Sequence, residues 1–147
     1  MKPAILFKRE WTDDDMIMLR AEICDGRSLF STDIYVGFSQ LKKAAQELGK
    51  FKDQIYGGIF NLRFGEFGSE YASGALDIRF HFVAQAKLFV RIHAESEFDV
   101  FQDRKVASST TMYLVSEPAL LDNFIASFDP FSQLNCDVAE LEGIIWR

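Results

Sequence analysis

Residues 75–95 read ALDIRFHFVAQAKLFVRIHAE, and this stretch decides the fold because two alternating apolar patterns flank a short loop. Residues 76, 78, 80 and 82 are apolar before the loop, and residues 88, 90, 92 and 94 are apolar after it. A period of two is typical of half-buried strands. Two such strands joined by residues 84–86 predict an antiparallel hairpin.

The register of this hairpin follows from the need to bring both apolar sets to one face. It places Phe80 opposite Val90 on the apolar face and Arg79 opposite Arg91 on the other face. The remaining opposed pairs are Phe82 with Leu88, Ile78 with Ile92, His81 with Phe89, and Asp77 with His93. One side of the hairpin is therefore predicted to be core, and the other a surface of mixed charge.

Composition excludes several classes of protein. The chain has 147 residues, of which 48% are hydrophobic and 15 are phenylalanine, so it can build a substantial core. Its formal net charge of −6 argues against nucleic-acid binding, which needs a clustered basic face. The sequence contains no apolar stretch that would span a bilayer and no signal peptide, so we expect a cytoplasmic protein that binds no membrane. Cys24 and Cys136 are expected to be reduced thiols.

Periodicity also places the other elements of the chain. Strands are predicted at residues 4–7, 16–23, 28–36, 59–64 and 109–115, and helices at residues 39–48 and 118–128. These elements predict an α+β fold: a twisted, mainly antiparallel sheet of six or seven strands with two helices packed on one face. The residues expected in the core are Ile34, Leu41, Leu48, Leu76, Ile78, Phe80, Val90, Ile92, Leu120, Phe124 and Ile125.

The residue types around the two helices predict their ends. Ser39 is expected to cap the first helix, and Gly49 to end it. Ser116 is expected to cap the second helix, which the Asp-Pro pair at residues 129–130 should stop.

The chain is interpreted as one domain, residues 1–147, in which residues 131–147 form a C-terminal extension. This tail alternates small apolar groups with acids, which fits either an edge strand or a short helix. Residues 98–108 are expected to form a surface connection, and the aspartates at residues 13–15 a solvated turn.

The histidines do not predict a metal site or a catalytic centre. His81 and His93 share a face of the hairpin but would lie about 13 Å apart, too far to ligate one zinc ion. Asp77 could orient His93 as an acid or base, but no nucleophile or oxyanion donor can be placed beside them. Ser39 lacks the second glycine of a nucleophile elbow. We therefore assign no catalytic residue, no metal ligand and no cofactor.

The pairing of Arg79 with Arg91 carries more information, because like charges directly opposite one another destabilise a pair of strands. Carboxylates on the diagonals, at Asp77 and Glu95, could compensate the two arginines, or a neighbouring element could do so. A partner protein could equally supply the missing acidic groups.

The order of elements resembles small bacterial immunity proteins, which are encoded beside contact-dependent, wall-associated toxins, and related families of similar length. The likeness covers residues 15–130 and is carried by the sequences DIYV at residues 33–36, GALDI at 74–78, LFV at 88–90 and the helix at 120–128. Two features depart from the pattern: Ala86 stands where a glycine is expected, and the tail is additional. The resemblance implies a non-enzymatic role in binding a toxin.

The sequence therefore predicts a non-catalytic protein that binds another protein. The resemblance suggests that this partner is a toxin. Its proposed binding surface consists of Arg79, Arg91, His93 and Glu95. The competing surfaces are the acidic turn at residues 13–15 and the tail acids Asp137, Glu140 and Glu142, which would suit a basic toxin. A small enzyme or small-molecule-binding protein, with a pocket between sheet and helices, is the alternative. The oligomeric state is left open.

Overall fold

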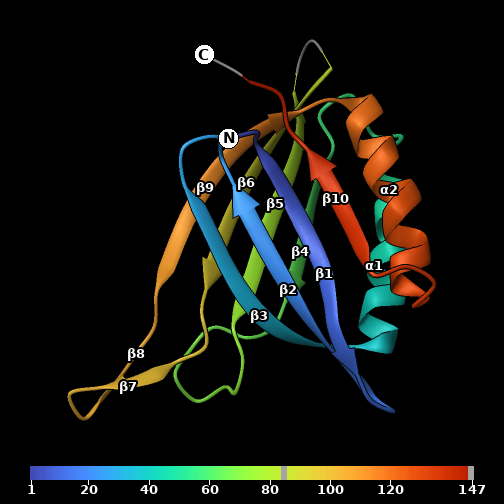
Figure 1. Cartoon of the computed structure of the whole chain (residues 1–147). Coiled ribbons are helices and arrows are strands. Elements are labelled where there is room, and N and C mark those ends of the chain that lie inside the picture. Colours follow the sequence, from blue (N-terminus) through green and yellow to red (C-terminus); the bar gives the residue numbers. More distant parts are fainter. Residues whose placement is uncertain (84–85, 146–147) are drawn as a thin grey trace.

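Eight of the ten strands in the described residues form two four-stranded antiparallel sheets rather than one sheet, and the other two form a small sheet of their own (Figure 1). The structure is a computed structural model, described here for residues 1–83 and 86–145. Across the first sheet the order is β10 (Val138–Glu142), β1 (Ala4–Thr12), β2 (Met16–Cys24) and β3 (Leu29–Gly37). Across the second sheet it is β4 (Ile59–Phe64), β5 (Ala75–Val83), β6 (Lys87–Glu95) and β9 (Ser109–Ser116). The α+β class is confirmed, but the prediction of a single sheet of six or seven strands is wrong.

Two sheets form because each has one apolar face, and these faces are buried in a common core. Phe7 of β1 and Phe64 of β4 meet at the centre, with ring centroids 6.1 Å apart and the rings edge to face. Sequence periodicity identifies the apolar face of each strand, but it does not say which strands share a sheet.

Two helices join the sheets and lie side by side along one open side of the molecule (Figure 1). Helix α1 (Phe38–Phe51) leads from β3 to β4, and α2 (Pro118–Ser132) leads from β9 to β10. The rings of Phe124 and Phe128 on α2 lie 6.2 and 6.1 Å from the ring of Phe7. The helices therefore complete the core where the two sheets leave it open.

Both predicted helices are present, but the residues that end them differ from the prediction. The N-cap of α1 is Gly37, whereas Ser39 lies inside the helix, as does Gly49. Ser116 does not cap α2, because its hydroxyl donates to the Glu142 carbonyl oxygen at 2.7 Å. A tertiary contact thus overrides the local capping preference of Ser116.

The Asp-Pro pair at residues 129–130 does not stop α2, which continues to Ser132 with Pro130 inside it. Phe131 is buried, and its ring lies 5.8 Å from that of Phe128. Burial of this last apolar turn offsets the proline, which removes one backbone donor.

The predicted register of the central hairpin is confirmed at all six of its opposed pairs, including Phe80 with Val90 and Arg79 with Arg91. Of the predicted loop, residues 84 and 85 lie outside the described residues. The expected core is also buried, except that Leu120 and Ile125 are only partly covered. Leu120 and Ile125 lie at the margin of the buried face of α2.

Two further strands and an edge strand were not fixed by the sequence pattern. Residues 98–108, expected as a connection, contain a small hairpin of β7 (Asp99–Phe101) and β8 (Arg104–Val106). The tail forms β10, which pairs with β1, so the edge-strand alternative is correct for residues 138–142.

The two sheets are joined by hydrogen bonds at two corners, and at the second of these the Ile144 N–H donates to the Val115 carbonyl oxygen at 2.8 Å. At one corner the Gly74 N–H donates to the Asp33 carbonyl oxygen at 2.9 Å, and Thr32 Oγ1 donates to the Glu95 carbonyl oxygen at 3.0 Å. A Cβ atom at Gly74 would collide with Thr32 Oγ1 and lie 2.6 Å from the Glu95 carbonyl oxygen. Only glycine allows this close approach of β3 to the second sheet.

No helix within residues 1–83 and 86–145 is both long enough and apolar enough to cross a membrane.

Candidate functional site

The outer face of the second sheet, which we call the arginine face, is not covered by either helix (Figure 1). Its side chains alternate with the buried ones along β4, β5, β6 and β9. They are Ile59, Asn61, Arg63, Asp77, Arg79, His81, Val83, Lys87, Phe89, Arg91, His93, Glu95, Ser109, Thr111 and Tyr113. The structure thus places all four residues of the predicted binding surface on one face.

The arginine face is basic although the chain is acidic. Its charged side chains are Arg63, Arg79, Lys87 and Arg91 against Asp77 and Glu95, a net charge of +2 with neutral histidines. Because the whole chain carries −6, the rest of the molecule carries −8. Charge is therefore strongly segregated between this face and the remaining surface.

One row of side chains crosses the centre of this face from edge to edge. Asn61, Arg79, Arg91 and Tyr113 lie directly opposite one another on successive strands. Neither Arg79 nor Arg91 lies within 4.0 Å of a carboxylate oxygen of any described residue. The repulsion that the sequence predicted between the two arginines therefore has no close internal remedy in this part of the chain.

Glu95, one of the two acids expected to compensate the arginines, is occupied elsewhere. Its Oε1 accepts the Gly68 N–H at 3.0 Å, which ties the loop before β5 to the edge of the face. Glu95 is thus a structural acceptor rather than a partner of Arg91.

The His93 ring contacts β9 and the loop before β5, and its Nδ1 atom forms its hydrogen bonds with β9 rather than with Asp77. Its Nδ1 lies 3.1 Å from the Thr110 carbonyl oxygen and 3.2 Å from Thr111 Oγ1. Its ring stacks on Phe67 at 4.9 Å, and the Arg63 guanidinium lies 5.2 Å from the centre of the same Phe67 ring. This arrangement orients an imidazole on the surface, beside one hydroxyl group, that of Thr111.

Two exposed aromatic side chains flank the arginines. Phe89 is 42% exposed and Tyr113 is 56% exposed, both unusual for large aromatic groups. Sequence reasoning placed Phe89 on this face but did not include Tyr113, Arg63 or Phe67. Alternation in STTMYLV would have put Tyr113 on an outer face, but only the pairing of β9 with β6 puts it beside Arg91.

The acidic turn at residues 13–15, a competing surface, has a structural role at its first residue. Asp13 Oδ1 accepts the N–H groups of Asp15 at 2.9 Å and Met16 at 2.8 Å. These two hydrogen bonds hold the pKa of Asp13 below its ordinary value. The carboxylate closes the turn between β1 and β2.

The acids of the tail, the other competing surface, are partly paired. Asp137 forms an ion pair with Arg9, and Glu142 forms one with Lys2 at 2.7 Å. Only Glu140 lacks an ion-pair partner among the described residues. The tail therefore offers a partner less unbalanced charge than the arginine face does.

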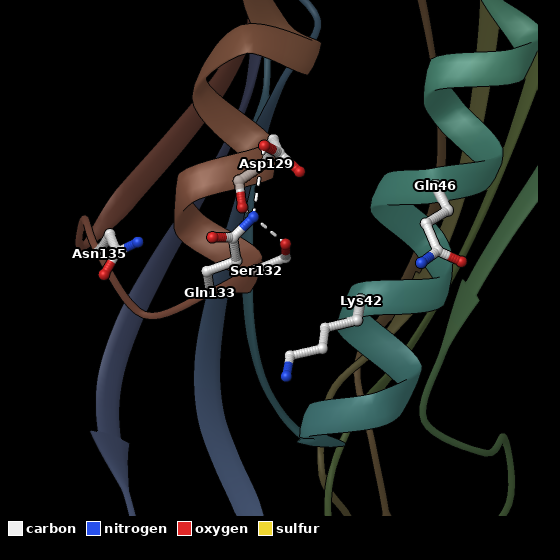
Figure 2. Close-up of a pocket in the computed structure, with 6 residues that line it drawn as sticks. All are labelled: Lys42, Gln46, Asp129, Ser132, Gln133 and Asn135. Atoms are coloured by element: carbon white, nitrogen blue, oxygen red, sulfur yellow. Dashed lines mark hydrogen bonds between the residues drawn. The ribbon is translucent and has the colours of Figure 1, made fainter.

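A shallow groove of about 350 Å³ lies between α1 and α2, lined by Lys42, Gln46, Asp129, Ser132, Gln133 and Asn135 (Figure 2). Gln133 Nε2 donates to Asp129 Oδ2 at 3.4 Å, and the Ser132 hydroxyl donates to the Asp129 carbonyl oxygen at 2.7 Å. The serine is thus engaged with the helix backbone, and the lining contains no histidine or cysteine. This groove does not assemble a nucleophile with a base.

The space between sheets and helices, where a ligand pocket was the alternative prediction, is filled by aromatic rings. Phe51 of α1 stacks on Phe82 at 5.0 Å and lies 5.7 Å from Phe60. Within the described residues, no group of three or more His, Cys, Asp or Glu side chains is placed to hold a metal ion.

Comparisons with models of protein families, with curated proteins and with solved structures find no match. The resemblance to immunity proteins therefore stays a prediction from the sequence.

Proposed function

We propose that this chain is a non-catalytic protein-binding domain that recognises an acidic surface of a partner protein through its arginine face. The observation that carries the proposal is the central row, where Arg79 and Arg91 lie opposite one another and no carboxylate oxygen of residues 1–83 or 86–145 comes within 4.0 Å of either.

The argument is electrostatic. Opposed like charges destabilise a strand pair, and no described carboxylate lies close enough to pair with these two arginines. Carboxylates on a partner would bind both guanidinium groups with charge-assisted hydrogen bonds, and a planar fork favours bidentate contact. Binding therefore removes an unfavourable term of the free protein in addition to forming new contacts.

The neighbouring side chains favour a protein over a nucleic acid. Arginine, tyrosine and phenylalanine are the residue types enriched at the centres of protein interfaces, and Phe89 and Tyr113 flank the arginines. Asp77 and Glu95 stand on the same face, where they would repel the continuous phosphates of a nucleic acid.

An immunity-type role, in which the bound partner is a toxin, is the form of this function that the sequence resemblance suggests. The arginine face adds a condition to that role. The contacted patch on such a toxin must be acidic, whereas a basic toxin would suit Glu140 and the other tail acids.

The test is a double charge reversal, Arg79→Glu with Arg91→Glu, compared with Lys42→Glu with Lys43→Glu on α1. Both double variants change the net charge equally, and all four side chains lie outside the core. Each immobilised protein would be exposed to a lysate of its native cell, and the captured proteins would be identified and retitrated in purified form. Poly-glutamate and a single-stranded oligonucleotide serve as defined acidic probes.

We expect a purified partner and poly-glutamate to bind the wild type and the α1 variant, and to lose at least tenfold affinity for the sheet variant. Affinity should also fall as salt rises. Partner binding that survives reversal of the sheet arginines but falls when Glu140 is neutralised would move the interface to the tail. Tight binding of the oligonucleotide alone would replace the protein partner with a nucleic acid.

A further inference from the structure

At three of the four edges of the two larger sheets, another part of the described chain contacts the edge strand. The edge of β3 is met by the segment before β5, where Gly74 donates to Asp33 and the Tyr35 N–H donates to Ser73 Oγ at 3.3 Å. Helix α1 approaches β4, and Gln40 Nε2 donates to the Arg63 carbonyl oxygen at 3.4 Å. Helix α2 packs along β10.

The fourth edge, that of β9, is open along most of its length. The Ile144 N–H donates to the Val115 carbonyl oxygen at 2.8 Å, so the backbone of Val115 faces away from β6. Because backbone groups alternate sides along a strand, those of Ser109, Thr111 and Tyr113 face the same way. Their N–H and C=O groups have no hydrogen-bond partner in the described part of the chain.

Space is also free beside this edge. A hollow of about 480 Å³ separates Tyr113 from the turn formed by Asp25, Gly26 and Arg27. Met1, Pro3 and Ile145 form the remaining walls of this hollow, so the described chain leaves the Tyr113 end of the edge unfilled.

Natural sheets protect an open edge with a lysine, a proline, a bulge or a very short strand. β9 has the sequence STTMYLVS, which contains no charge and no proline, and it pairs with β6 over eight residues without a register shift. The unprotected edge is therefore suited to pairing with another strand.

We propose that the edge of β9 pairs with the β9 edge of a second copy of this chain, in antiparallel register about a twofold axis at Thr111. This register sets Thr111 opposite itself and Ser109 opposite Tyr113 of the second copy. The three outward-facing residues of each copy then exchange backbone hydrogen bonds with their counterparts. Thr110 and Met112, which alternate with them, meet on the inner face.

Charge favours a second copy as the occupant. Each copy carries −6, so two copies repel each other overall, and a contact between them is opposed least where neither surface is charged. The strand of residues 109–116 is uncharged, and an uncharged antiparallel strand places no like charges opposite one another when it meets itself. The symmetric pairing joins two four-stranded sheets into one of eight strands, with both arginine faces on the same continuous surface.

The first experiment measures the mass of the purified full-length chain by sedimentation or light scattering between roughly 1 and 500 µM, where mass action governs dimer formation. We expect mass to rise from monomer to dimer. Amide exchange of Ser109, Thr111 and Tyr113 should slow at least tenfold as dimer forms. A wild-type chain that stays monomeric throughout would overturn the proposal and leave the edge to a strand of a different partner.

The second experiment tests the register with three variants. Thr111→Lys and Thr111→Glu each bring two like charges together at the axis, so each should raise the dimer dissociation constant roughly five- to tenfold. An equimolar mixture of the two should recover dimer as the mixed species. Asn61→Lys, on the exposed face of the opposite edge strand β4, is the control and should dimerise as the wild type does.

Two results would contradict the register. Dimer that is unaffected by either Thr111 variant places the interface elsewhere, and dimer lost in both variants but not recovered in the mixture shows that Thr111 does not face itself. Circular dichroism establishes that each variant is folded. None of these measurements involves a partner protein, so they stand apart from the test of the arginine face.

Discussion

The outer faces of the two sheets differ in whether carboxylates pair with cations that lie opposite one another on neighbouring strands. The first sheet also sets two cations against each other, since Lys8 of β1 lies opposite Arg20 of β2. There, Lys8 pairs with Glu22 at 3.2 Å, and Arg20 is 3.0 Å from Asp33 and 3.3 Å from Glu10. On the arginine face, Arg79 lies opposite Arg91 in the same way, but neither forms an ion pair with a carboxylate in the described part of the chain.

The difference teaches that the unpaired arginines do not result from a shortage of acids. The chain has 22 acidic and 16 basic side chains, and the first sheet uses its acids to neutralise the same kind of cation pair. The second sheet has the same antiparallel geometry and lacks that compensation. The contrast supports the proposal that acidic groups of another molecule bind to the arginine face.

The largest expected effect tests which face of the second sheet is the core. Replacing the fully buried Phe80 by Ala should lower the free energy of unfolding by about 3 to 5 kcal/mol, because it leaves a cavity among aromatic rings. Arg79→Ala, one residue away on the outer face, should change stability by less than about 0.5 kcal/mol. Denaturant unfolding measures both, and similar losses in the two variants would contradict the assignment of faces.

A smaller effect is expected where the first sheet meets the second. Gly74→Ala should cost about 1 to 3 kcal/mol, since the added methyl group collides with Thr32 Oγ1 and crowds the Glu95 carbonyl oxygen. Gly49→Ala is the matched control, because no atom beyond its own helix backbone and chain neighbours lies within 4 Å of a Cβ there, and it should stabilise α1 by roughly 0.5 to 1 kcal/mol. Chemical denaturation of both variants would show whether this corner is closely packed.

The comparison of the two outer faces predicts that removing an arginine changes the stability of the protein in opposite directions on the two faces. Arg20→Ala removes a cation that pairs with Asp33 and Glu10, and it should destabilise the protein by up to about 1 kcal/mol, because these pairs are exposed. Arg91→Ala removes one of two opposed, unpaired cations and should be neutral or slightly stabilising. Urea midpoints at low and moderate salt measure the difference. Equal destabilisation by both substitutions would show that the arginine face has an internal partner after all.

The smallest expected effect is a loss of stability at acid pH that depends on a turn of the first sheet. Asp25 accepts the N–H groups of Ser28 and Arg27 in the turn between β2 and β3, and these bonds hold its pKa below its ordinary value. A lowered pKa in the folded state gives stability that is complete above the unfolded pKa of about 4 and is lost as pH falls through the folded pKa. Asp25→Asn should therefore lose less stability than the wild type between pH 6 and pH 3.

Asp53→Asn provides the control for this pH dependence, because Asp53 is exposed and accepts no side-chain hydrogen bond from the described residues. Its pH profile should follow that of the wild type in thermal unfolding. A profile for Asp25→Asn that is indistinguishable from both would remove the turn carboxylate as a source of acid sensitivity.

Local pattern determined much of what the sequence predicted correctly. The register of β5 and β6 followed from two matching alternations and a short loop, and the opposed Arg79 and Arg91 followed from the register. The four predicted surface residues share one face for the same reason. Such inferences hold where partners are close in sequence.

Distant partners account for what the sequence did not predict. The division into two sheets depends on which apolar faces meet, and Phe7 contacts Phe64 only after α1 has led the chain from the first sheet to the second. Ser116 was expected to cap α2, but its hydroxyl donates a hydrogen bond to the Glu142 carbonyl oxygen. Glu142 lies in β10, a strand that the sequence pattern did not distinguish from a short helix. Tyr113 joins the candidate site because β9 pairs with β6 across an intervening hairpin.

The pairing of β1 with β10 has a consequence for synthesis of the protein. Arg9 and Asp137, which form an ion pair across these strands, are 128 residues apart in the chain. Contacts at such sequence separation raise the contact order, and they form late because a long segment must be ordered first. While β10 is still inside the ribosome, β1 has an unpaired edge and Phe7 lacks part of its cover. The nascent chain is therefore a natural client for a chaperone until its last strand emerges.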